Sequence, residues 1–355
     1  MSKPRIAFVA FTLGTGMSPL ILATCAALKS RFDLRLFVPA HFRYSDASIP
    51  TTLFPSAKSK YARGLAMLDP RTHHNIAKEI EAFKPDLVHL FNAHGYPWSV
   101  TLMRFCRKKG IPAILTVHDP VPHPANFLDS LHHKLGAISA RNATLVHLFN
   151  KRYLESERQR FGRPTAFADY ISIAQFYLMH AQAGVAKENA ILQFGRLEYY
   201  KGIDRLVNAA PLLPPGMKVI IAGPGKVTPA VRDAIEASPD RFELHEKFLT
   251  DREVAELFQR ARVSVLPYRE VTQSLHHVIA AEFGVTTVAS DMGFFHDEVP
   301  RFNGLVVNSE NPNELADAIV RASTMAPVIP LHYATETIVA QYADMYRAAI
   351  DLQPS

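Results

Sequence analysis

Short apolar runs alternate along the whole chain with stretches in which apolar residues recur every three or four positions. An apolar run bounded by turn residues predicts a buried strand, whereas the second spacing predicts a helix with one buried face. In the first half, the predicted strands are 5–11, 33–38, 86–91, 111–117 and 143–149, with helices that end near residues 28, 109 and 160.

The second half repeats this alternation, which is typical of parallel sheets covered by helices on both faces. Its predicted strands are 189–194, 218–222, 242–248, 263–267, 286–290 and 304–307, and its predicted helices are 203–210, 229–237, 251–260, 274–283, 312–322 and 332–352. We therefore expect an α/β protein with two doubly wound, Rossmann-like domains that face a cleft. The expected domains are 1–184 and 185–331, joined by a short polar linker, and the helix in 332–355 should cross back toward the first domain.

One stretch of the first half breaks the pattern. Residues 41–74 contain Pro50, Pro55 and Pro70, which predicts a long irregular connection. Long connections in compact domains are often binding loops, and the aromatic and basic side chains here suit a lipid-linked acceptor. The alternative is ordinary variation of an exposed surface.

Length and charge narrow the class of protein. The 355 residues suffice for about two domains, and 48% hydrophobic with 20% charged residues is typical of folded proteins. Residues 1–185 hold 23 Lys and Arg against 11 Asp and Glu, whereas residues 186–355 hold 16 against 22. A basic first half suits an anionic membrane or a phosphorylated substrate, or is simply a soluble surface. We expect no nucleic-acid partner, because no basic run is interleaved with aromatic residues.

The expected location is the cytoplasm, or the inner face of the membrane. Cys25 and Cys106 are too few for a disulfide framework, which favours a reducing compartment. No run of about 18 apolar residues predicts a membrane-spanning helix. The N-terminal apolar region could pass for a signal peptide, but Gly14 and Gly16 interrupt it where a strand turns into a helix.

The loop between strand 189–194 and helix 203–210 carries candidate chemistry. Arg196 and Lys201 lie just beyond the carboxyl end of a predicted parallel strand, where such sheets bind ligands. The N–H groups and the positive dipole end of the next helix favour a phosphate, to which Arg adds a hydrogen-bonding fork and Lys a point charge. The alternative is that both are ordinary solvated cations.

The first half offers weaker signals. Gly14 and Gly16 are similar to the start of a dinucleotide-binding fingerprint, but Pro19 stands in place of its third Gly, so we expect no nicotinamide or flavin cofactor. His118 follows strand 111–117 and should face the ligand-binding edge, although a lone His is often structural. Adjacent His pairs point apart and no HExxH spacing occurs, so we expect no metal site.

Four stretches of the second half resemble the retaining GT-B glycosyltransferases of family 4. They are FGRLEYYKGIDRLVNAA (194–210), KVIIAGPGK (218–226), FLTDREVAELFQRARVSVLPYRE (248–270) and GVTTVASDMGFFHDEV (284–299). The resemblance implies the GT-B fold, with a nucleotide-sugar donor bound mostly by the second domain and an acceptor bound mostly by the first. It implies no cofactor, because the donor is a substrate.

The same resemblance implies roles for individual residues. Arg196 and Lys201 match the pair that grips the donor diphosphate, and Glu270 matches the first acid of the family's E-x7-E signature, which bonds the transferred sugar. His118 matches a first-domain residue near that sugar. The other positions that match donor-binding residues are Gly14, Gly16, Gly195, Gly223, Lys226, Phe248, Leu249, Thr272, Gln273 and Ser274.

The chain departs from the family at the second acid, where Val278 or Ile279 stands, and Glu282 follows about one turn later. The expected function is retaining, metal-independent transfer of a hexose from a UDP- or GDP-sugar to a saccharide or lipid-linked saccharide in surface polysaccharide biosynthesis. Since no Asp-x-Asp pair occurs to hold a metal ion, fixed cations would have to neutralise the leaving diphosphate. Two alternatives stay open: a nucleotide-sugar epimerase on the same scaffold, and a nucleotide-sugar-binding partner without catalysis.

Overall fold

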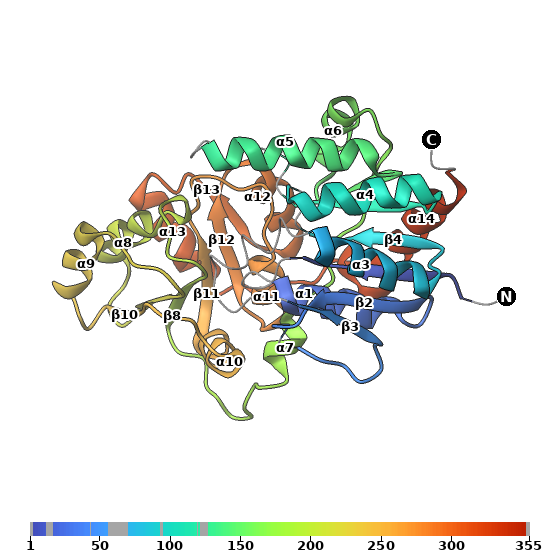
Figure 1. Ribbon diagram of the computed structural model, residues 1–355. Coiled ribbons are helices and arrows are strands. Elements are labelled where there is room, and N and C mark those ends of the chain that lie inside the picture. The colour runs from blue at the N-terminus through green and yellow to red at the C-terminus, as the bar shows by residue number, and fades with distance from the viewer. Residues whose placement is uncertain are drawn as a thin grey trace. The chain divides into compact units, whose positions relative to one another are not determined.

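The chain folds into two compact units (Figure 1). The computed structural model describes residues 3–11, 17–42, 44–55, 70–92, 95–118, 120 and 127–352. The first unit comprises residues 1–171 and 335–355, and the second comprises residues 172–334. The boundary therefore lies earlier than the expected position between residues 184 and 185.

Residues 172–184 belong to the second unit because of their contacts. α7 (Ala174–Leu178) packs against α10 (Asp251–Arg260). The backbone N–H of Gln182 donates to the side-chain oxygen of Gln259 over 3.0 Å, and the Gln259 amide donates back to the Gln182 carbonyl over 2.7 Å. Polar composition alone could not reveal this packing.

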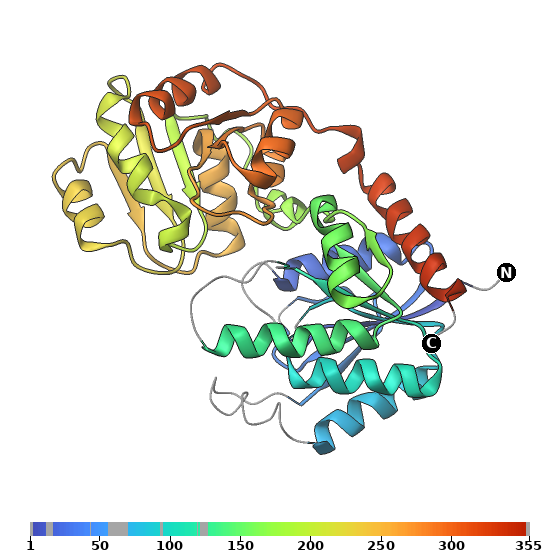
Figure 2. The same cartoon turned by 90° about the horizontal axis from the view of Figure 1, so that it is seen from above.

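Seven parallel strands form the sheet of the first unit, in the order β3-β2-β1-β4-β5-β6-β7. α1 and α14 pack on one face of this sheet, and α3, α4, α5 and α6 cover the other (Figure 2). The strands are β1 (Arg5–Val9), β2 (Asp33–Pro39), β3 (Thr51–Phe54), β4 (Leu87–Leu90), β5 (Ala113–Val117), β6 (Leu145–Leu148) and β7 (Thr165–Phe167). The helices are α1 (Met17–Leu28), α3 (Pro70–Phe83), α4 (Pro97–Lys109), α5 (Phe127–Asn142), α6 (Leu154–Phe161) and α14 (Thr335–Asp351).

Six parallel strands form the second sheet, in the order β10-β9-β8-β11-β12-β13. α8, α9 and α13 bury their apolar faces on one side of it, and the remaining helices lie on the other. The strands are β8 (Ala190–Phe194), β9 (Lys218–Ala222), β10 (Phe242–His245), β11 (Ala261–Leu266), β12 (Thr286–Ser290) and β13 (Leu305–Val307). Besides α7 and α10, the helices are α8 (Ile203–Ala209), α9 (Pro229–Glu236), α11 (His276–Glu282), α12 (Gly293–Glu298) and α13 (Pro312–Ala322). No helix in the described parts of either unit is both long and apolar enough to cross a membrane.

The prediction of an irregular connection over 41–74 is wrong in part. β3 lies within it as an edge strand parallel to β2, and α3 begins at Pro70, because proline fits the first turn of a helix. Residues 56–69 lie outside the described part of the chain. The sequence pattern also missed β7 and α12, which are too short for a period to show, and α5, whose interior Gly136 weakens a helix signal.

A chain of buried side chains ties α14 to the first sheet. The Tyr346 hydroxyl lies 2.8 Å from His89 Nδ1, and His89 Nε2 lies 2.8 Å from Thr116 Oγ1. His147 continues the chain, with Nδ1 2.9 Å from Thr116 and Nε2 3.0 Å from the carbonyl oxygen of Ala168. A carbonyl oxygen only accepts hydrogen bonds, so each group in this chain donates to the next one, from the Tyr346 hydroxyl to the Ala168 carbonyl. Burial lowers the pKa of His147 to about 3 and that of His89 well below its usual value, so both rings are neutral, as this chain requires.

Candidate active site

Four loops lie along the carboxyl edge of the second sheet. They follow β10, β9, β8 and β11, which are neighbours in that order. β9, the next strand after β8 in the sequence, pairs with one side of β8, and β11 pairs with the other side of β8. This edge therefore contains the topological switch point at which doubly wound sheets bind ligands. Every predicted site residue of the second unit lies on one of these loops.

Lys201 is a buried cation at this edge. Only 6% of its surface is exposed, and its ammonium lies 3.8 Å from the centre of the Tyr268 ring and 5.1 Å from that of Tyr200. Glu198, three residues earlier, pairs with Arg196 instead. Burial, together with the positive charge of Arg196, lowers the pKa of Lys201 to about 7. A buried ammonium that ring faces hold in place, and that pairs with no described carboxylate, can accept an anionic ligand.

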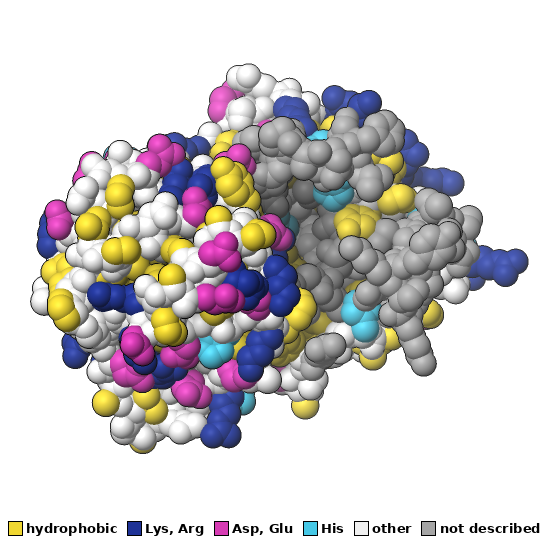
Figure 3. Space-filling view, turned by 90° about the vertical axis from the view of Figure 1, so that its left-hand side faces the viewer, with side chains coloured by type: hydrophobic (Ala, Val, Ile, Leu, Met, Phe, Trp, Pro, Cys, Tyr) yellow, Lys and Arg dark blue, Asp and Glu magenta, His cyan; other side chains and the backbone are white. Residues whose placement is uncertain are grey.

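Two exposed cations of the same unit have acidic partners. Lys226 lies 3.0 Å from Glu246, and Lys247 lies 2.6 Å from Glu253. On the left-hand side of Figure 3, basic and acidic side chains are intermixed over the surface. Lys201 differs from Lys226 and Lys247 because it is buried, so the alternative of two ordinary solvated cations is wrong for Lys201.

Arg196 has a different environment. Its side chain is about half exposed, its Nη1 lies 2.9 Å from a carboxylate oxygen of Glu198, and its Nη2 donates to the Tyr200 hydroxyl over 3.2 Å. It lies close enough to Lys201 to lower the pKa of that ammonium. A diphosphate bound here would have to compete with Glu198 for the guanidinium.

Two glycines bring the loops after β8 and β9 together. A Cβ atom on Gly223 would lie 1.9 Å from the carbonyl oxygen of Gly195. A Cβ atom on Gly195 would lie 3.0 Å from His276 Nε2 and 3.9 Å from Lys201 Nζ. Because glycine has no side chain, the backbone at these two positions can pass directly beside the buried ammonium, as close contact with a ligand requires.

The loop after β11 carries Glu270, which is exposed. Thr272 and Gln273 are half-buried, and Ser274 is buried with its hydroxyl 3.2 Å from His276 Nδ1. α11 begins at His276, two residues later than predicted. Glu270 and the turn before α11 therefore lie on the loop that also carries Tyr268.

α11 offers no acid where the family signature has its second one. Val278 and Ile279 are 1% and 3% exposed and belong to the core. Glu282 ends the helix, about 9 Å along its axis from His276. Burial raises the pKa of Glu282. The helix therefore supplies no carboxylate at the edge where Glu270 lies.

The loops after β9 and β10 carry the remaining predicted residues. Lys226 is exposed and paired with Glu246, which also accepts the N–H of Val227 over 2.8 Å. Phe248 is 73% exposed, and Leu249 is half-buried. β10 is three strand positions from β11, so the four loops span about 14 Å of the edge. A base, a diphosphate and a sugar laid along this edge can contact successive loops.

Family models match most of the sequence. The model described as Glycosyl transferases group 1 matches residues 188–324, and the model described as Glycosyltransferase Family 4 matches residues 14–164. The chain belongs to glycosyltransferase family 4. The resemblance found in the second half of the sequence is thereby confirmed, and the first half of this glycosyltransferase, where the resemblance is weaker, matches as well.

Solved structures share the fold of the glycosyltransferase. HepE from Anabaena in complex with UDP-glucose is 18% identical, with 97% of this chain and 99% of that chain covered and a TM-score of 0.67. Sucrose-phosphate synthase from Thermosynechococcus elongatus is 15% identical, with coverages of 98% and 100% and a TM-score of 0.72. Trehalose 6-phosphate synthase from Burkholderia multivorans is 14% identical, with coverages of 99% and 98% and a TM-score of 0.64. These likenesses confirm the prediction of two Rossmann-like units. No curated protein matches the sequence.

In the first unit of the glycosyltransferase, His118 follows β5 at the carboxyl edge. Its Nε2 lies 2.7 Å from the carbonyl oxygen of Phe91, so this nitrogen carries the proton and donates it. The ring contacts Phe149 with 5.1 Å between centres. Gly14 and Gly16 lie outside the described residues. The roles of all three in the reaction stay predictions.

The sequence analysis missed the aromatic groups around the ammonium of the glycosyltransferase. Tyr200 directly precedes Lys201, but Tyr268 lies on the loop after β11, and no sequence pattern links the two. It also missed His276, whose ring lies beside Gly195. Burial and the nearby Lys201 lower the pKa of His276 well below its usual value. Among the described residues, no three His, Cys, Asp or Glu side chains are grouped as metal ligands would be.

Proposed function

We propose that this glycosyltransferase moves a hexose from a UDP- or GDP-sugar to a saccharide or lipid-linked saccharide, with retention and without a metal ion. The second unit binds the donor and the first binds the acceptor. We assign the reaction to surface polysaccharide biosynthesis in the cytoplasm, with peripheral contact to an anionic membrane. The excess of Lys and Arg in residues 1–185 supports that contact.

The buried ammonium of Lys201 is the observation that carries the proposal. Burying a lysine costs free energy unless a partner stabilises its charge. Lys201 has ring faces and a neighbouring arginine around it, and no carboxylate of the described residues forms an ion pair with it. A nucleotide diphosphate supplies the missing negative charge. HepE from Anabaena, which shares the fold, was crystallised with UDP and with UDP-glucose, which supports a UDP-sugar as the first donor to test.

The proposed reaction needs no nucleophile from the protein. The acceptor hydroxyl attacks the anomeric carbon on the face that the diphosphate leaves, and its proton passes to the departing diphosphate oxygen. Arg196 and Lys201 neutralise the charge that develops on this oxygen, and one such fixed group typically contributes about 2.7–4 kcal/mol to the transition state. Glu270 bonds the hydroxyls of the transferred sugar, and His118 of the first unit is assigned to the same sugar.

Glu270→Gln is expected to weaken UDP-glucose binding by about tenfold and to change UDP binding by less than about twofold. The reason is that only the sugar of the donor forms hydrogen bonds with this carboxylate. Isothermal titration calorimetry with both ligands measures the two affinities. Glu256→Gln, an exposed substitution on α10, is the control and should change neither. An equal loss for UDP and UDP-glucose in Glu270→Gln contradicts the assignment.

A thermal-shift screen with UDP-, GDP-, ADP- and dTDP-sugars tests the proposal as a whole, because a ligand that binds the native state raises the melting temperature. The stabilising donor is then incubated with saccharide and lipid-linked acceptors. The apolar Val278 and Ile279 favour one rival, a donor-binding partner without catalysis, which would bind a donor but transfer nothing. An isomer formed from the donor alone would instead indicate an epimerase.

A further inference from the structure

The two loops that carry Lys201 and Glu270 are joined by more than the sheet beneath them. Lys201 ends the short 3-10 helix Tyr199–Lys201 after β8, and Glu270 follows β11. The backbone N–H of Arg269 donates to the carbonyl oxygen of Tyr200 over 2.7 Å, which links the residue before Glu270 to the residue before Lys201. The proposed contacts to the diphosphate and to the sugar thus come from loops that are bonded to each other.

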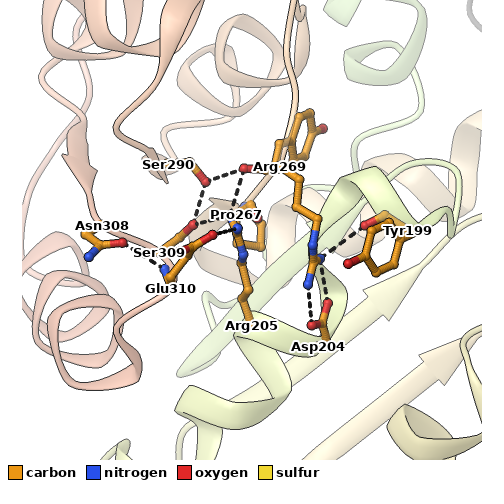
Figure 4. A network of polar contacts seen from close by, with 10 residues as sticks. Tyr199, Asp204, Arg205, Pro267, Arg269, Ser290, Asn308, Ser309 and Glu310 are labelled. Carbon is orange, nitrogen blue, oxygen red and sulfur yellow. Dashed lines mark hydrogen bonds and ion pairs between the residues drawn. The ribbon is translucent and has the colours of Figure 1, made fainter. Parts of the chain in front are cut away.

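Arg269 and Asp204 form the first connection (Figure 4). Asp204 lies in the first turn of α8, and both of its carboxylate oxygens accept from Arg269, over 2.8 and 2.6 Å. The Arg269 guanidinium also donates to the carbonyl of Tyr199 over 3.2 Å and lies 4.2 Å from the centre of the Tyr199 ring. A forked pair of this kind fixes direction as well as distance.

Arg205 forms the second connection. Its Nη1 donates to the carbonyl of Tyr268 over 3.1 Å and to Ser309 Oγ over 2.9 Å, and its Nη2 pairs with Glu310. Ser290 donates to the same Tyr268 carbonyl over 2.8 Å. The backbone of Tyr268 is therefore held from two sides.

These contacts bear on the site because the Tyr268 ring lies against the Lys201 ammonium. We propose that Asp204, Arg205 and Arg269 are positioning residues that hold the Lys201 ammonium and the Glu270 carboxylate at a fixed separation, so that one donor molecule contacts both. This inference rests on the proposed function for its ligand. The geometry that it requires is testable without any ligand.

The ligand-free test follows Lys201 by NMR in protein labelled with 13C and 15N at lysine. Its Cε–Nζ signal is assigned from its absence in Lys201→Met. In the wild-type protein this signal should titrate near pH 7. In Asp204→Asn and Arg269→Gln it should titrate at least about one unit higher, because a loosened Tyr268 admits water to the ammonium. An unchanged titration in both variants overturns the proposal.

The control variant is Glu188→Gln. Glu188 pairs with both Nε and Nη2 of Arg260, over 2.7 and 3.2 Å, as Asp204 pairs with Arg269. The side chains of the two pairs are similarly exposed, at 18% and 45% for Arg260 and Glu188 and at 20% and 40% for Arg269 and Asp204. Glu188→Gln should leave the titration of Lys201 unchanged. If it shifts the titration as far as Asp204→Asn does, general loosening of the unit is the cause and the proposal fails.

The second test measures UDP and UDP-glucose binding by calorimetry in the same variants. Asp204→Asn and Arg269→Gln should reduce the affinity for UDP-glucose, relative to the affinity for UDP, about tenfold. The affinity for UDP itself should change by less than about threefold, because only a donor that contacts both loops depends on their separation. A ratio equal to that of Glu188→Gln contradicts the proposal. If the wild-type protein binds neither ligand, UDP-sugars fail as donors, and the NMR titration still decides whether the positioning exists.

Discussion

Lys201→Met is expected to reduce sugar transfer by at least about 100-fold and, at the same time, to raise the melting temperature of the unliganded protein. Activity should fall because the leaving diphosphate loses a fixed positive charge. Stability should rise because methionine fills the space under Tyr268 without the cost of a buried charge. We expect a gain of about 2 kcal/mol, after allowing for the lost contact with two rings. For a unit of this size the gain corresponds to roughly 4–8 °C.

The gain should depend on pH in a defined direction. The pKa of Lys201 is about 7 in the folded protein, against about 10.4 for an unperturbed lysine. Between these values the unfolded chain binds more protons, so the stability of the wild-type protein rises with pH. The advantage of Lys201→Met should therefore be largest at or below pH 7 and should shrink toward pH 10.

Calorimetric melting curves from pH 6 to pH 10, together with a transfer assay, measure both effects. Lys218→Met is the control, because Lys218 is exposed at the amino end of β9 and lies far along the strand from the carboxyl edge. It should alter neither activity nor the pH dependence of stability. Full activity in Lys201→Met, or a lower melting temperature at pH 7, contradicts the role of the buried ammonium.

Gly223→Ala is expected to abolish donor binding and to destabilise the second unit by roughly 3 kcal/mol or more. The added methyl group would lie 1.9 Å from the carbonyl oxygen of Gly195 and 2.6 Å from its carbonyl carbon. Neither is the end of a flexible side chain, so the backbone of one loop must move. That movement should displace Gly195 from Lys201 and change the proposed donor site.

Gly216→Ala separates this clash from the strain of the backbone conformation. Gly216 also has a positive φ, of 83°, but a Cβ atom there meets nothing within 4 Å. We expect it to cost about 1 kcal/mol and to leave donor affinity unchanged. Calorimetry with UDP-glucose and thermal melting measure both variants. Wild-type affinity in Gly223→Ala would show that the contact between the two loops does not shape the donor site.

Much of the fold could be predicted from the sequence where local signals coincide with tertiary packing. The predicted helix 251–260 agrees in both bounds with α10, because Thr250 and Glu253 form a capping box at its start. The predicted helix 312–322 agrees with α13, which begins with Asn311 as its cap and Pro312 in its first turn. Neither element needs distant contacts to define its ends.

The site could be predicted only as a set of positions. The family resemblance singles out Arg196, Lys201 and Glu270 from the sequence, but their surroundings depend on three strands that are distant in sequence. Three contacts join segments that follow different strands: the ring of Tyr268 under Lys201, the approach of Gly223 to Gly195, and the forked pair of Asp204 with Arg269. Such contacts follow from the order of strands in the sheet, which hydrophobic periodicity does not encode.

Proton uptake on binding UDP-glucose reports whether the donor diphosphate lies beside the Lys201 ammonium. The pKa of Lys201 is about 7, whereas burial and the nearby Lys201 hold the pKa of His276 well below its usual value. A diphosphate beside the ammonium should raise this pKa, so at pH 8 binding should take up roughly half a proton or more. Titrations in buffers of different ionisation enthalpy measure the uptake. The wild-type protein should take up protons on binding UDP-glucose, and Lys201→Met should take up none. Equal uptake by the two proteins, or binding by the wild-type protein without uptake, would rule out a diphosphate beside Lys201.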